Sequence, residues 1–95
     1  MNSKLKNEKL DELFAGILCL KSIEECYNFF EDLCTVSEIK AMSQRFNVAG
    51  MLSRGAQYSE IVADTRASTA TISRVNRCLS YGTDGYATIL KRLEK

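Results

Sequence analysis

The segment STATIS at residues 68–73 gathers hydroxyl and methyl side chains, with Arg66 before it and Arg74 and Arg77 after it. Small side chains allow a backbone to come close to a base edge, and hydroxyls hydrogen-bond phosphate oxygens. A guanidinium group binds phosphate or guanine through paired hydrogen bonds. This combination favours contact with DNA, and the alternative for the small residues is ordinary helix capping and surface chemistry.

Charge is distributed unevenly along the chain, although the net charge is only +1. Residues 1–40 carry five lysines and eight acidic residues, for a net −3, whereas residues 41–82 carry five arginines and two acidic residues, for a net +3. A local excess of this size also occurs on solvated helix surfaces. The position of this positive charge favours DNA binding over a solvated helix surface, because three of the arginines lie in or beside the STATIS region.

Six helices and no sheet are expected to position these side chains. The chain has no proline and five glycines, which favours helices joined by short turns. Apolar residues at helical spacing predict the helices, and Ser22, Thr35, Ser59 and Ser68 are candidate N-caps. The expected ranges are 8–20, 23–33, a long helix from Thr35 to a stop at Gly55, 58–65, 69–80 ended by Gly82, and 84–94. The fold class is therefore all-α, in a single domain of residues 1–95.

Residues 58–80 fit a helix-turn-helix, in which a supporting helix, a tight turn and a second helix follow in succession. The turn is expected at Arg66 and Ala67, and the leading end of the second helix would enter a major groove. The two helices are expected to pack through Ile61, Val62, Ile72 and Val75. The residues expected at the DNA are Arg66, Ser68, Thr69, Ala70, Thr71, Ser73, Arg74 and Arg77.

The other apolar stripes are assigned to the interior. Those before residue 53 are expected to form core and dimer interface, because a chain of 95 residues buries only a modest core by itself. Ile89, Leu90 and Leu93 are expected to face inward from the last helix.

No metal, cofactor or catalytic activity is expected. The cysteines, Cys19, Cys26, Cys34 and Cys78, form no C-x-x-C pair, and the chain has no histidine, whereas zinc sites draw on such close ligand pairs. Core packing in apolar stripes is the better role for them. No arrangement typical of an enzyme is present. Without an apolar run of about 20 residues or a secretory signal, a cytoplasmic protein with no membrane partner is expected.

Two segments resemble the tryptophan repressor family: TVSEIKAMSQRFNVAGMLSRG at residues 35–55 and ASTATISRVNRCL at residues 67–79. The resemblance is greatest to the YerC/YecD branch of that family. It implies a six-helix subunit, an intertwined homodimer built mainly from residues 1–55, and two helix-turn-helix units that face successive major grooves. It also implies base contacts by Thr69, Ala70 and Ser73, and a phosphate contact by Thr71.

The resemblance further implies an effector pocket. Arg45 and Arg74 match the arginines on either side of bound tryptophan, and Cys34 and Thr35 match residues supplied by the opposite subunit. In the family, the bound amino acid shifts the population towards dimers that can dock on DNA. The alternative for the two arginines is surface or intersubunit ion pairing with the acidic N-terminal half.

Three departures from the family pattern bear on the pocket and the turn. Val75 replaces the glycine that makes room for the ligand, and Cys78 replaces a serine. The valine narrows the pocket, so tryptophan is not expected to bind, and any small-molecule effector is unidentified. Arg66 replaces the glycine of the turn. This change indicates either an added phosphate contact or a less demanding backbone, that is, a turn whose conformation does not require glycine.

The sequence therefore predicts a homodimeric, sequence-specific regulator of transcription that binds double-stranded DNA, with repression as the expected effect. The alternative is a helical protein–protein interaction module that does not bind DNA. Salt-dependent retention on duplex DNA separates the two, because counterion release weakens phosphate binding steeply as salt rises.

Overall fold

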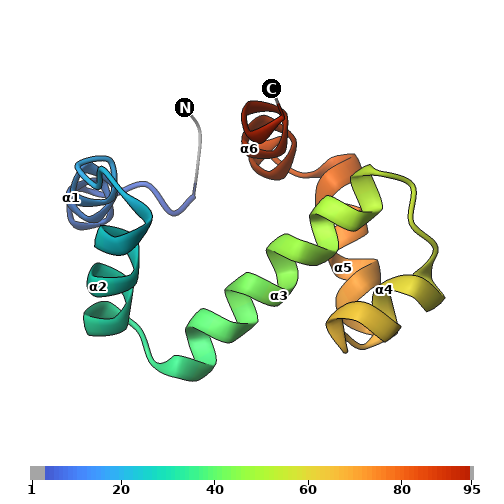
Figure 1. The fold of residues 1–95 in the computed structure, drawn as a ribbon. Helices are drawn as coiled ribbons and strands as arrows, with labels where there is room; N and C mark the ends of the chain where they lie inside the picture. The colour runs from blue at the N-terminus through green and yellow to red at the C-terminus, as the bar shows by residue number, and fades with distance from the viewer. Residues whose placement is uncertain (1–3, 95) are drawn as a thin grey trace. The chain divides into compact units, whose positions relative to one another are not determined.

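The computed structural model describes residues 4–94. These residues form six α-helices and no strand, which confirms the expected all-α fold class (Figure 1). The helices are α1 (Glu8–Ile17), α2 (Ile23–Leu33), α3 (Val36–Ser53), α4 (Tyr58–Thr65), α5 (Thr69–Tyr81) and α6 (Gly85–Leu93). None of them is both long and apolar enough to cross a membrane within the described part of the chain.

The described residues fall into two compact units, one ending at Thr35 and the other beginning at Val36. The first unit contains α1 and α2, and the second contains α3 to α6. In the second unit α5 packs against α3, α4 and α6, and α3 packs against α4 and α6. Along α5 the chain starts beside α4 and ends near α6 (Figure 1).

The core of the second unit lies where α3, α4 and α5 meet. Its buried residues are Val48, Ala49, Ile61, Ala67, Ile72 and Val75. Each valine or isoleucine side chain buried in this way contributes roughly 1.5–3 kcal/mol. Three of the four residues expected to join the short helices are in this core, but Val62 is 38% exposed, so its assignment was wrong.

Helix α3 stops where the sequence places a glycine. Gly55 has φ of 84°, which a residue without Cβ adopts without steric cost. Its N–H donates to the carbonyl of Leu52, and the N–H of Ala56 donates to that of Met51, at 3.0 Å each. This pair of bonds is the Schellman arrangement, and it satisfies carbonyls that the helix end would leave free.

The capping predictions were right for two helices and wrong for one. Ser22 accepts a hydrogen bond from the N–H of Glu25 at 3.0 Å, and Ser68 accepts one from Thr71 at 3.1 Å. Helix α4 is instead capped at Gln57, whose N–H donates to Glu60 Oε1 at 3.0 Å, and Ser59 lies inside the helix. The Gln57–Glu60 hydrogen bond satisfies the N–H of Gln57 at the start of the helix, and Ser59, two residues further in, is not the capping residue.

Two helix ends also differ from the prediction. Helix α1 ends at Ile17 instead of residue 20, because the N–H groups of Cys19 and Leu20 bond carbonyls three residues back in a tighter turn. Helix α6 turns Tyr86 and Leu90 towards the core, while Ile89 is 45% and Leu93 62% exposed. Ile89 and Leu93 therefore do not face the core of this subunit.

The first unit has no core of its own, since α1 and α2 contain no buried residue. Its exposed apolar side chains include Leu5, Phe14, Leu18, Ile23, Tyr27 and Leu33. The cysteines follow the same pattern, because Cys19 and Cys78 are exposed and Cys26 and Cys34 only half-buried. None of them belongs to the core of the second unit, and all four are free thiols.

Candidate nucleic-acid interface

The turn between α4 and α5 is fixed by side-chain hydrogen bonds. Thr65 Oγ1 donates to the carbonyl of Ile61 at 2.7 Å and accepts from the N–H of Ala67 at 3.2 Å. Gln44 of α3 donates through Nε2 to the carbonyl of Thr65 at 3.1 Å. With Ala67 only 2% exposed, the turn is anchored both to its own helix and to α3.

Arg66 lies within this turn in the left-handed region, with φ of 62° and ψ of 13°. Its N–H donates to the carbonyl of Val62 at 2.9 Å, which closes the end of α4. The sequence allowed a less demanding backbone at this position, but the structure shows a conformation that favours glycine. The interpretation that the backbone of the turn does not need a conformation typical of glycine was therefore wrong.

The leading end of α5 carries a short chain of hydroxyl hydrogen bonds. Ser68 Oγ accepts from the N–H of Thr71 and donates to Thr71 Oγ1, at 3.1 Å in both cases. This arrangement leaves the hydroxyl hydrogen of Thr71 available to an outside acceptor. The first turn of α5 contains no acidic residue, so the positive end of its dipole is not offset by a carboxylate there.

The two sides of α5 differ sharply in exposure. Ile72 and Val75 are buried and Leu79 is half-buried, in positions three and four residues apart that share one face. The opposite surface presents exposed residues, namely Thr69, Ala70, Ser73, Arg74 and Arg77, together with Ser68 at the cap. The structure thus brings the predicted DNA-binding residues together on one accessible surface, with Thr71 half-buried beside them.

The residues of the expected effector pocket have different surroundings. Arg45 and Arg74 are exposed on α3 and α5, and Cys78 is exposed on α5. Val75 is 1% exposed and belongs to the same core cluster as Ala49. The position that the sequence resemblance assigned to the opening of a ligand pocket is therefore occupied by a packed side chain. The other two residues, Cys34 and Thr35, lie in the first unit.

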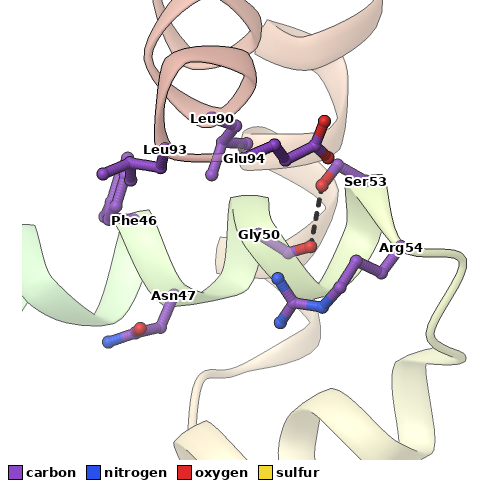
Figure 2. Close-up of a pocket in the computed structure, with 8 residues that line it drawn as sticks. All are labelled: Phe46, Asn47, Gly50, Ser53, Arg54, Leu90, Leu93 and Glu94. Carbon is purple, nitrogen blue, oxygen red and sulfur yellow. Dashed lines mark hydrogen bonds between the residues drawn. The ribbon is translucent and has the colours of Figure 1, made fainter.

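A cavity of about 260 Å³ lies elsewhere, between α3 and α6 (Figure 2). Phe46, Leu90 and Leu93 supply its apolar wall, and Asn47, Gly50, Ser53, Arg54 and Glu94 complete it. Ser53 Oγ donates to the carbonyl of Gly50 at 2.8 Å. Sequence reasoning missed this cavity. The available signal was Gly50 inside a long helix, which indicates a close approach, and a Cβ there would meet Arg54 Nη1 at 3.2 Å.

Helices α4 and α5 are joined by the three residues 66–68 and packed on α3, and with the other helices of residues 4–94 they define an all-α protein of the helix-turn-helix class. The family model for the Trp repressor protein matches residues 8–94. The chain therefore belongs to the Trp repressor family.

Individual relatives agree with this assignment. The chain is 54% identical over 92 residues to the uncharacterised protein YerC of Bacillus subtilis (strain 168), covering 97% of this chain and 88% of that protein. The crystal structure of a TrpR-like protein from Eubacterium eligens ATCC 27750 superposes with a TM-score of 0.92 at 54% identity, over 97% of this chain and 95% of the other. A crystal structure from Staphylococcus aureus gives a TM-score of 0.91 at 54% identity, over 95% and 90% of the two chains.

Proposed function

We propose that this protein is a homodimeric, sequence-specific DNA-binding regulator of transcription that acts as a repressor. The observation that carries the proposal is the exposed leading end of α5, where Thr69, Ala70 and Ser73 face outwards on a helix fixed by buried residues. Base recognition requires side chains held rigidly at the tip of an element that fits a major groove. Membership of the Trp repressor family supports the same function.

The charges near this end favour nucleic acid as the ligand. Arg66, Arg74 and Arg77 are exposed, and none of their side chains forms a hydrogen bond or ion pair within residues 4–94. The amides at the start of α5 that lack a partner within the helix add partial positive charge in the same place. A phosphate backbone on either side of an inserted helix satisfies all of these groups at once.

A homodimer is proposed because α1 and α2 contain no buried residue. Helices of this length are marginal in water without tertiary packing. Leu18 is 85% and Ile23 77% exposed, and large apolar surfaces of this kind mark association sites. A second copy of the chain would cover them and would supply two helix-turn-helix units per particle.

The proposal is tested by selecting bound duplexes from a random pool and measuring affinity across a range of salt concentrations. We expect an enriched sequence with two related half-sites, and a logarithmic affinity that falls linearly with the logarithm of salt concentration. A protein that enriches no sequence and is not retained on duplex DNA at low salt would instead be an interaction module.

Replacing Thr71 or Arg74 by alanine is expected to weaken duplex binding by roughly tenfold or more, since each removes a contact worth about 1–3 kcal/mol per subunit. Neither side chain belongs to the buried core, so circular dichroism should show an intact fold. If both variants bind the selected duplex as tightly as the wild type, α5 is not the recognition helix.

Calorimetry with free tryptophan is expected to show little or no binding. An indole ring needs an open apolar slot, and Val75 is packed against the core beside the expected site. Saturable heat at millimolar tryptophan or below would show that the pocket opens despite the valine.

The dimer proposal predicts that Leu18→Glu converts the protein to a monomer in light scattering. In a lone subunit a carboxylate at an 85% exposed position costs almost nothing, whereas at an apolar interface it must be desolvated. Asn28→Glu, which places the same carboxylate on an exposed polar position of α2, is the control and is expected to stay dimeric. A wild-type protein that is monomeric at micromolar concentration would contradict the dimer.

A further inference from the structure

We draw no further inference here: the strongest candidate, the partly apolar cavity between α3 and α6 beside Phe46, Leu90 and Leu93, carries nothing, because nothing in the structure shows what covers it and covering by a second copy would restate the proposed homodimer.

Discussion

Ile72→Ala is expected to lower the free energy of unfolding by about 2–5 kcal/mol, which is the range for removing a fully buried aliphatic side chain. Ile72 is completely buried and joins α5 to the core formed with α3 and α4. A small domain has only about 5–15 kcal/mol of stability in total, so this single change should unfold much of the protein near body temperature. Urea denaturation followed by circular dichroism measures the loss.

The core prediction has a graded series and a control. Ile72→Val removes one methylene group and should cost about 0.5–1.5 kcal/mol. Val62→Ala removes two methyl groups from a residue of α4 that is 38% exposed, so its effect should be much smaller than that of Ile72→Ala. All variants must be compared at one protein concentration, because the stability of a dimer depends on it. Equal losses for Ile72→Ala and Val62→Ala would show that Ile72 does not anchor α5.

Ser73→Glu is expected to abolish specific DNA binding, with a loss of at least about 100-fold, since a carboxylate facing phosphates and base edges costs several kcal/mol per complex. Ser73 is exposed on α5, and glutamate is a good helix former, so the fold should be unchanged. Fluorescence anisotropy with the selected duplex measures the affinity.

Ser80→Glu is the matched control, because Ser80 is exposed on the same helix about two turns further along and on nearly the same face. It makes the same chemical change at the trailing end of α5. If only the leading end enters the groove, this variant should lose at most a few-fold in affinity. A loss as large as that of Ser73→Glu would mean that α5 lies along the DNA over its whole length.

The helices could be predicted from the sequence to a large extent because their ends carry local signals. The range 58–65 agrees with α4, and Gly55 stops α3 by a conformation that its missing side chain permits. Errors arose where two local signals competed, as at Gln57 and Ser59. Val62 was misassigned because consecutive residues of an α-helix lie about 100° apart, and in the short helix α4 the core contacts the face of Ile61 and leaves Val62 38% exposed.

The candidate site was predictable by position but not by conformation. Type and spacing singled out the hydroxyl and arginine residues around α5, and in the structure these residues are exposed, apart from the half-buried Thr71. The left-handed backbone of Arg66 could not be predicted, because it results from the fit of the turn between two helices and not from the preference of arginine. Leu18 and Ile23 show a second limit. Apolar periodicity marks a face for burial but does not say which surface covers it, and both side chains are exposed in the described residues.

The hydrogen bond from Gln44 to the carbonyl of Thr65 joins the turn to the long helix α3. Helices α4 and α5 therefore cannot rotate relative to α3 without breaking this hydrogen bond, and they move together with α3. In the proposed dimer, this coupling of the short helices to α3 means that two properties of the DNA target site depend on different parts of the protein. The identity of its bases would depend on the tip of α5, while the gap between its two halves would depend on how the two copies of α3 are coupled, so each could evolve without changing the other.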